Sequence, residues 1–160
     1  RGIIDHFRLL GDRLHAGLQG IPGLRLPQCV AGGRSSYWFY LLRVDEDALG
    51  VTRDWFLQAL QAEGVEAGGY LAAPVYRTGV FTDQATLGRS GLPFTLPGVS
   101  VGGRYDEGAC PVAEEILRTC VNIGLGMWRS LQEIDEIVAA VRKVAAYGVA
   151  QRGGATMSPR

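Results

Sequence analysis

The sequence predicts an α+β domain in which a small sheet is covered by helices. Apolar residues recur at three- and four-residue steps near both ends of the chain, which is typical of amphipathic helices. The segment Ser36–Val44 consists almost entirely of aromatic and branched residues, which favours a strand. The elements alternate in the order helix, strand, helix, strand, long loop, helix, strand, helix, and this order predicts the α+β class.

The first helix is expected within residues 1–20 and leads into the domain. Its apolar face is formed by Ile3, Phe7, Leu10, Leu14 and Leu18. Its polar side is formed by Asp5, Arg8, Asp12 and Arg13. Gly20 and Pro22 end the helix, and residues 21–34 are expected to form a loop. Because the helix begins with the chain, we expect the sequence to be a piece of a longer protein.

The central elements follow from strand and capping patterns. Ser36–Val44 has little polar alternation, so both faces of this strand are expected to be covered. Thr52 is a suitable N-cap for a helix that ends at Gly64. The inward-facing residues of that helix are expected to be Trp55, Phe56, Ala59 and Leu60. A short strand is possible at Val65–Ala67.

The last third of the chain begins after a long irregular stretch, residues 68–108, of the kind that is often functional. Pro111 occupies a favourable first helical position for a helix that ends near Thr119. A strand is expected at Cys120–Ile123. Ser130 and Glu133 have the spacing of a capping box before a long amphipathic helix, which is expected to end at Gly148. The domain is therefore expected to span 21–149, with a disordered tail at 150–160.

Composition excludes several classes of protein. The 160 residues, 47% hydrophobic and 20% charged, fit one domain with a packed core. Sixteen basic residues balance sixteen acidic ones, which argues against a nucleic-acid partner. No apolar run is long enough to span a membrane, and no signal peptide opens the chain. The three cysteines, which we expect to fill the core, indicate a reducing compartment, so a cytoplasmic protein is expected.

Motifs for chemistry are sparse. The phosphate-loop, dinucleotide, nucleophile-elbow and C-x-x-C patterns are all missing from the sequence. His6 and His15 lie on opposite sides of the first helix and are not expected to share a metal. Lys143 is the one lysine and is expected to be a surface charge, so no catalytic residue is assigned to this chain. Tyr70, Pro74, Tyr76 and Arg77 form a loop cluster whose Tyr and Arg donors suit polyol or phosphate recognition, although a structural loop fits equally well.

Several strings resemble the C-terminal part of the DegT/DnrJ/EryC1/StrS family of sugar aminotransferases. They occur in the family's order, are individually weak and span almost the whole of residues 1–144. They are SSYWFYLLRVD (35–45), RDWFLQALQAEGVEAGGY (53–70), APVYRTGVF (73–81), CPVAEEILRTCVNIGL (110–125) and LQEIDEIVAAVRKV (131–144). There are two departures. Ser35 stands where many members have His, and CVNIGLGMW replaces the usual string near the end of the strand.

The resemblance implies a small, mostly antiparallel C-terminal domain of a fold type I enzyme that uses pyridoxal 5'-phosphate. It implies transamination of a keto-sugar or keto-cyclitol with glutamate or glutamine as the amino donor, in a homodimer. The cofactor-holding Lys of the family lies upstream, so this chain alone is expected to be inactive. By position, the resemblance implies that Ser35, Tyr70, Tyr76 and Arg77 contact the substrate.

Two other functions stay open at this point. A relative whose upstream Lys is replaced would be a dehydratase or a non-catalytic regulator. A stand-alone binding domain would need no cofactor. The residue that separates an aminotransferase from a dehydratase-type relative lies outside this chain.

Overall fold

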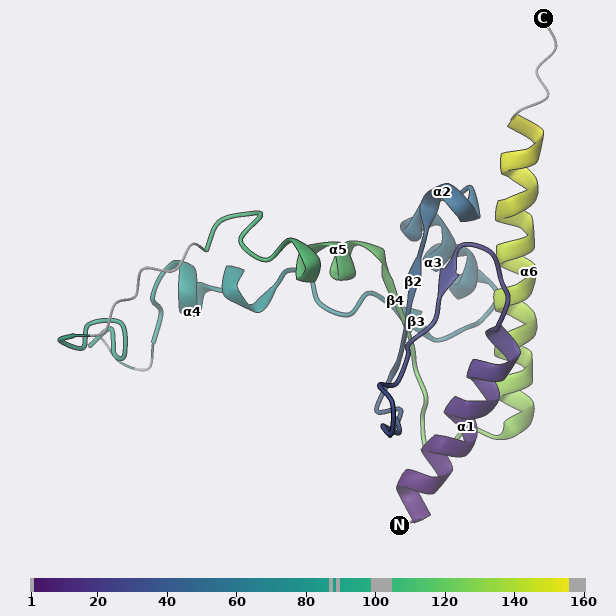
Figure 1. Ribbon diagram of the computed structural model, residues 1–160, viewed down its shortest axis with the longest axis horizontal. Helices are drawn as coiled ribbons and strands as arrows, with labels where there is room; N and C mark the ends of the chain where they lie inside the picture. The colour runs from purple at the N-terminus through teal and green to yellow at the C-terminus, as the bar shows by residue number, and fades with distance from the viewer. Residues whose placement is uncertain (1, 87, 89, 99–104, 156–160) are drawn as a thin grey trace, which may run out of the picture. The chain divides into compact units, whose positions relative to one another are not determined.

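The computed structural model describes residues 2–86, 88, 90–98 and 105–155 and divides the chain into two compact units (Figure 1). Unit 1 contains the residues up to Tyr70 and those from Thr119 onward. Unit 2 spans Leu71–Arg118. The domain boundaries at residues 20 and 149 stay predictions.

A four-stranded antiparallel sheet forms the centre of unit 1. Its strands lie in the order β1 (Leu24–Arg25), β2 (Tyr40–Val44), β4 (Cys120–Ile123) and β3 (Ala67–Gly68). Tyr40 is paired with Ile123, so strands from distant parts of the sequence form the middle of the sheet. The predicted α+β class and the antiparallel sheet are confirmed.

Helices cover one face of this sheet. They are α1 (Gly2–Leu18), α2 (Glu46–Leu49), α3 (Arg53–Ala62) and α6 (Leu131–Ala155). Alternate residues of β2 enter the core with β4 residues, while the residues between them are half-buried. Among the described residues, one face of this strand is therefore fully covered and the other only in part, so the prediction that both faces are covered is confirmed for one face.

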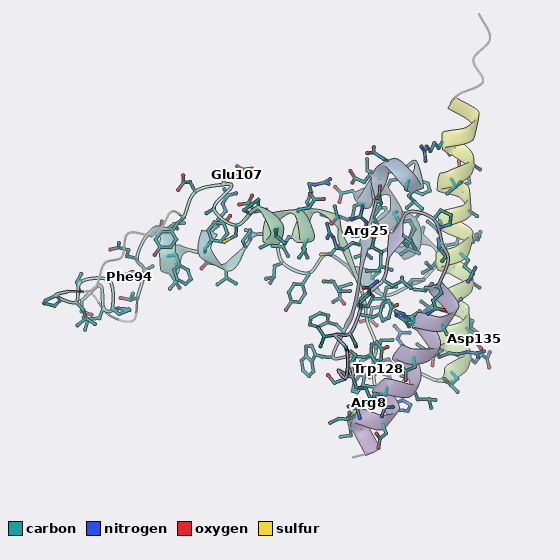
Figure 2. The ribbon with its side chains drawn as sticks, in the orientation of Figure 1. Arg8, Arg25, Phe94, Glu107, Trp128 and Asp135 are labelled. Carbon is teal, nitrogen blue, oxygen red and sulfur yellow. The ribbon has the colours of Figure 1, made fainter. Side chains whose placement is uncertain are left out.

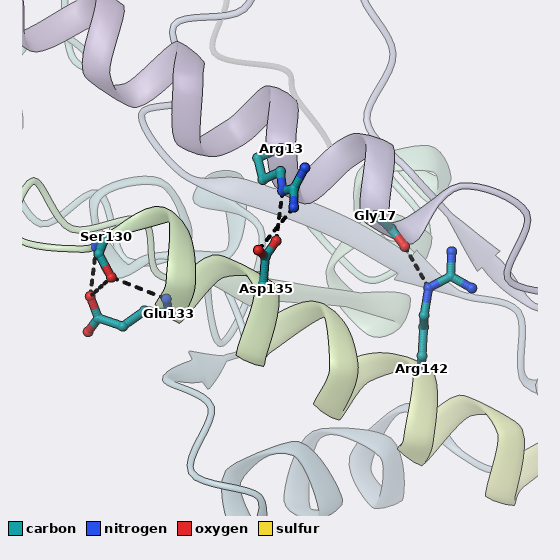
Figure 3. Close-up of polar contacts among 6 residues, drawn as sticks. All are labelled: Arg13, Gly17, Ser130, Glu133, Asp135 and Arg142. Atoms are coloured by element: carbon teal, nitrogen blue, oxygen red, sulfur yellow. Dashed lines mark hydrogen bonds and ion pairs between the residues drawn. The ribbon is translucent and has the colours of Figure 1, made fainter.

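The seam between α1 and α6 is both apolar and polar. Leu10, Leu14 and Leu18 of α1 are fully buried. The Arg13 guanidinium donates two hydrogen bonds, of 2.7 and 3.0 Å, to the Asp135 carboxylate, and Arg142 Nε donates to the Gly17 carbonyl at 2.7 Å (Figure 3). The first helix is thus an integral part of unit 1.

The predicted capping box at the start of α6 is confirmed. The Glu133 carboxylate accepts from the Ser130 backbone N–H at 2.7 Å, and Ser130 Oγ accepts from the Glu133 N–H at 3.2 Å (Figure 3). These bonds satisfy two backbone donors that the helix itself leaves without a partner. The hydrogen bonds that the Glu133 carboxylate accepts from the Ser130 backbone N–H and then from the Ser130 hydroxyl lower the pKa of this carboxyl.

The end of α6 differs from the prediction. The helix continues through Gly148 to Ala155, so residues 150–155 of the expected tail are helical, and 156–160 lie outside the described residues. A Cβ at Gly148 would lie only 2.9 Å from the Leu49 carbonyl oxygen. Gly148 therefore provides space for the end of α2 and does not terminate the helix.

Helix α3 is as predicted, whereas one of its side chains and three short elements differ from expectation. The helix capped by Thr52 is confirmed, since its Oγ1 accepts from the Trp55 N–H at 3.2 Å. Trp55 is not an inward residue, because its ring stacks on Tyr147 at 5.6 Å and remains 36% exposed. The short strand is β3 at Ala67–Gly68, and β1 and α2 were not predicted.

Unit 2 is held by local contacts. It contains the 3-10 turn η1 (Val75–Arg77), α4 (Gly79–Thr82) and most of α5 (Pro111–Thr119), which begins at the predicted proline. The Phe81 ring contacts the rings of Phe94 and Tyr105. Every residue described between 71 and 118 is at least partly exposed, so this unit lacks a closed core within its described residues.

Candidate functional site

Ser35 lies in a tight turn just before β2. Its Oγ accepts a hydrogen bond from the Tyr37 backbone N–H at 3.0 Å, and its carbonyl accepts from Arg8 Nε at 3.1 Å. Tyr37 has a φ of 49°, which is uncommon for a residue with a side chain. This backbone conformation is incompatible with a strand, so the prediction of a strand from Ser36 is wrong and β2 begins at Tyr40.

The Tyr37 side chain is enclosed by neighbours from α1 and β2. Its ring stacks on Tyr40 at 6.1 Å with an interplanar angle of 16°. Burial, followed by a hydrogen bond to the Asp12 carboxylate, raises the pKa of Tyr37 from its usual 10.0 to about 12. The Tyr40 hydroxyl is hydrogen-bonded to His15 Nδ1 at 3.0 Å. Tyr37 and Tyr40 therefore serve to hold the turn and are not free acids or bases.

Tyr70, the last residue of unit 1 before unit 2, contacts the segment between Ser35 and β2. Its ring lies 4.9 Å from the Phe39 ring, and the residue is 44% exposed. Because the side chain is partly exposed, it can present its hydroxyl to a ligand. Tyr70 thus contacts Phe39, which lies four residues after Ser35 in the chain.

Tyr76 is engaged within unit 2. Its hydroxyl donates a hydrogen bond to the Glu114 carboxylate, which also accepts from the Gly108 N–H at 2.8 Å. The hydrogen bond raises the pKa of Tyr76 and lowers the pKa of Glu114. Since the hydroxyl proton points to Glu114, the oxygen of Tyr76 retains acceptor capacity for a ligand hydroxyl.

Arg77 is a partly exposed cation of unit 2. Its Nη1 lies 3.8 Å from Oε2 of Glu107, which Figure 2 labels, and the Arg77 side chain is 43% exposed. An ion pair of this length and exposure is weak. The guanidinium can therefore receive a carboxylate or a phosphate with little loss.

The four predicted residues fall into two pairs. Ser35 and Tyr70 belong to unit 1, whereas Tyr76 and Arg77 belong to unit 2. That all four contact one substrate stays a prediction. Sequence reasoning missed the partner Glu114 and the supporting α1 residues. The sequence places Arg8 and Asp12 on the polar side of the first helix. The pattern that could have revealed their role is their spacing around Gly11, which places all three residues on one helical face.

The residues present do not provide a cofactor-holding lysine. Lys143 Nζ lies 2.8 Å from both Glu63 carboxylate oxygens, and its side chain is 69% exposed. A solvated, paired ammonium on a helix surface does not fit an imine-forming lysine, which needs a lowered pKa. The prediction of a surface charge is confirmed.

The cysteines differ in burial, and His, Cys, Asp and Glu are the side chains that could hold a metal ion. Cys120 is buried as a core filler, but the same expectation is wrong for Cys29 and Cys110, which are exposed. In the described part of the chain, no three His, Cys, Asp or Glu side chains gather to hold a metal ion. Among the described helices, none has the length and apolar character needed to cross a membrane.

Comparisons with known proteins identify the fold. No protein-family model matches the chain, and no curated protein matches it in sequence. DesI, solved in the presence of its TDP-sugar product, is 16% identical with a TM-score of 0.65 and is aligned over 96% of this chain and 34% of its own. DesV from S. venezuelae, solved with a ketimine intermediate, is 20% identical with a TM-score of 0.67, over 89% and 32%.

A third structure carries the family name. It is a DegT DnrJ EryC1 StrS aminotransferase from Brucella abortus, 18% identical with a TM-score of 0.59, aligned over 88% of this chain and 30% of its own. The chain has the fold of one part of these aminotransferases. It spans about a third of the length of the structures that it matches, as the resemblance of its sequence strings predicted.

Proposed function

We propose that this chain is the C-terminal part of a pyridoxal 5'-phosphate-dependent aminotransferase of the DegT/DnrJ/EryC1/StrS family. The complete enzyme would transfer an amino group from glutamate or glutamine to a keto-sugar or keto-cyclitol. The single observation that supports this best is the fold match to DesI, DesV and the Brucella protein over nearly all of this chain. Five sequence strings in the family's order support it independently.

The cofactor would be held mainly by residues outside this chain. The cofactor supplies the electron sink for transamination, and Lys143 does not fit the role of its lysine. We therefore assign no chemical step to this chain. Its part in the reaction is to bind and orient the substrate.

Ser35 and Tyr70 are the proposed contacts from unit 1. The Ser35 oxygen already accepts from the Tyr37 N–H, so its hydroxyl is left to donate to a ligand oxygen. Tyr70 offers a partly exposed ring and a hydroxyl, a combination that suits the faces and hydroxyls of a sugar. The direction of the Ser35 bond therefore selects an acceptor atom on the substrate.

Tyr76 and Arg77 are the proposed contacts from unit 2. The Tyr76 oxygen can accept from a substrate hydroxyl, because its proton is committed to Glu114. Arg77 would bind a substrate carboxylate or a nucleotide phosphate by charge-assisted hydrogen bonds. Both proposals predict changes in substrate affinity and not in the chemical step.

The assembly and compartment follow from the same proposal. The enzyme would be a cytoplasmic homodimer, as the family resemblance implies. Exposed side chains that a dimer or the rest of the enzyme could cover include Trp38, 81% exposed, and Trp128, 76% exposed.

The test is an assay of the intact enzyme, expressed from its own reading frame and loaded with pyridoxal 5'-phosphate. We expect amino-sugar formation from a nucleotide-linked keto-sugar or a keto-cyclitol, with consumption of glutamate or glutamine. Loss of a hydroxyl group without amination would support a dehydratase-type relative and contradict the proposal. Binding of the sugar without any turnover would support a non-catalytic protein and also contradict it.

Arg77→Ala tests the substrate contact in the same assay. We expect the KM for the keto substrate to rise about tenfold with little change in kcat, because a charge-assisted hydrogen bond is lost from binding. Arg118→Ala is the matched control, since Arg118 is an exposed arginine of unit 2 that pairs with Glu115 on its own helix. An unchanged KM in Arg77→Ala would remove this residue from the site.

A further inference from the structure

One face of α1 contacts the turn that carries Ser35. Arg8 Nε donates a hydrogen bond of 3.1 Å to the Ser35 carbonyl, and Figure 2 shows Arg8 on this helix. One turn further along, Gly11 is buried beneath the Tyr37 ring, and a Cβ at this position would overlap the ring carbons. The nearby Asp12 carboxylate is one of the causes that raise the pKa of Tyr37. Positions 8, 11 and 12 share one helical face, so three neighbouring α1 residues support a single turn.

The turn would not be stable in this shape without support. Tyr37 has a left-handed backbone, φ 49°, which sterics disfavour for residues other than glycine. It is retained because the ring is stacked on Tyr40 and packed on Gly11. The same backbone shape directs the Tyr37 N–H to Ser35 Oγ at 3.0 Å. The direction of the Ser35 hydroxyl therefore depends on contacts made by α1.

We propose that Arg8 and Gly11 are positioning residues that fix the 35–37 turn on α1 and so aim the Ser35 hydroxyl at the substrate. The proposal rests on the proposed function, in which Ser35 contacts the substrate. Arg8 holds the turn from its carbonyl side, and Gly11 provides the space that the Tyr37 ring occupies. Neither residue touches the substrate itself.

The proposal makes two separable claims. The first concerns the turn alone: loss of Arg8, or a methyl group at Gly11, loosens the Tyr37 N–H to Ser35 Oγ bond. The second concerns binding: a loosened turn lowers affinity for the substrate but leaves the chemical step unchanged, because the cofactor is held elsewhere. A residue with only a structural role would change stability without this selective rise in KM.

Hydrogen exchange of the Tyr37 amide in the 160-residue chain tests the first claim. We expect Arg8→Ala and Gly11→Ala to speed this exchange about tenfold, the change that corresponds to one hydrogen bond. Arg13→Ala is the control for removing an arginine from α1, since Arg13 pairs with Asp135 and not with the turn. Gly2→Ala is the control for adding a methyl group to α1, since nothing lies within 4 Å of its Cβ. Equal exchange rates in variants and controls would overturn the proposal.

Steady-state kinetics of the intact enzyme test the second claim. We expect Arg8→Ala, Gly11→Ala and Ser35→Ala each to raise KM about five- to tenfold, with kcat within about twofold of the parent. Arg8→Lys keeps a charged donor and should recover part of the lost affinity. The double variant Arg8→Ala/Ser35→Ala should be no worse than Ser35→Ala, because Arg8 acts through Ser35.

The outcomes separate this proposal from the proposed function. If the Tyr37 amide exchanges faster in Arg8→Ala but Ser35→Ala leaves KM unchanged, Ser35 is not a substrate contact and the positioning proposal is wrong. If Ser35→Ala raises KM but Arg8→Ala and Gly11→Ala do not, only the positioning proposal falls. If the enzyme forms no amino product, the proposed function fails, and the amide exchange still reports whether α1 holds the turn.

Discussion

Replacement of Leu14 by Ala should show that α1 is part of the core. Leu14 is fully buried between the helices and the sheet, so truncation removes buried methyl groups and leaves a cavity. Leu→Ala changes at such sites cost about 3 kcal/mol, within a usual range of roughly 2–5. That loss would lower the folding equilibrium constant about a hundredfold, and it is a large fraction of the stability of an ordinary domain.

The assay is urea unfolding of the 160-residue chain followed by circular dichroism. Leu9→Ala is the matched control, because Leu9 lies on the same helix and is 53% exposed. We expect a lower transition midpoint for Leu14→Ala at an unchanged slope, and a change below about 0.5 kcal/mol for Leu9→Ala. Equal midpoints in the two variants would refute the placement of α1 in the core.

Three further predictions concern single groups. Glu133→Gln should lower the free energy of unfolding at neutral pH. The difference in this free energy between variant and parent should shrink as pH falls below 4.5, because the folded pKa of Glu133 lies below that value. An equal loss of stability at all pH values in acid titrations would contradict this. Asp12→Asn should lower the pKa of Tyr37 from about 12 in an ultraviolet titration. In the parent, the stability that Tyr37 contributes should be lost as pH rises from 10 through 12, because its folded pKa is raised. An unchanged titration in the variant would exclude the Asp12 contact. Gly148→Ala should destabilise the chain by about 1–3 kcal/mol in thermal unfolding, despite the better helix propensity of Ala, because the added methyl group meets the Leu49 carbonyl oxygen; a stabilised variant would show that Gly148 is not a packing residue.

The elements with local signals could be predicted from the sequence. Ser130 and Glu133 form their capping box, Thr52 caps α3, and Pro111 begins α5. In each case the signal and the structure lie within four residues of each other. Local hydrogen bonds of this kind do not depend on the rest of the fold.

The errors come from contacts between distant segments. A glycine such as Gly148 is a common helix terminator, and the sequence therefore predicts that the helix ends there. In the structure this glycine instead makes room for the Leu49 carbonyl oxygen, from a residue about a hundred positions earlier in the chain. Likewise, the aromatic stretch before Tyr40 has strand composition, but Tyr37 packs on Gly11 and adopts a left-handed backbone. Tertiary contacts override local propensity at both positions.

The role of the candidate site stays a prediction. Ser35, Tyr70, Tyr76 and Arg77 follow from a resemblance and from residue chemistry, and the structure shows that all four are at least partly exposed. Their partners could not be predicted, because Arg8 and Glu114 lie 27 and 38 residues away from the groups they hold. Spacing along a helix is visible in a sequence, whereas the loop that docks on that helix is not.

The most direct test of the proposed aminotransferase is to read the coding sequence immediately before Arg1. The proposal predicts that the frame continues into a large α/β domain with a Lys after a strand, in the position that holds the cofactor. A start codon directly before Arg1 would contradict it, because Lys143 does not fit that role. A continuing frame with another residue in place of the Lys would also contradict it and would identify a dehydratase-type or non-catalytic relative.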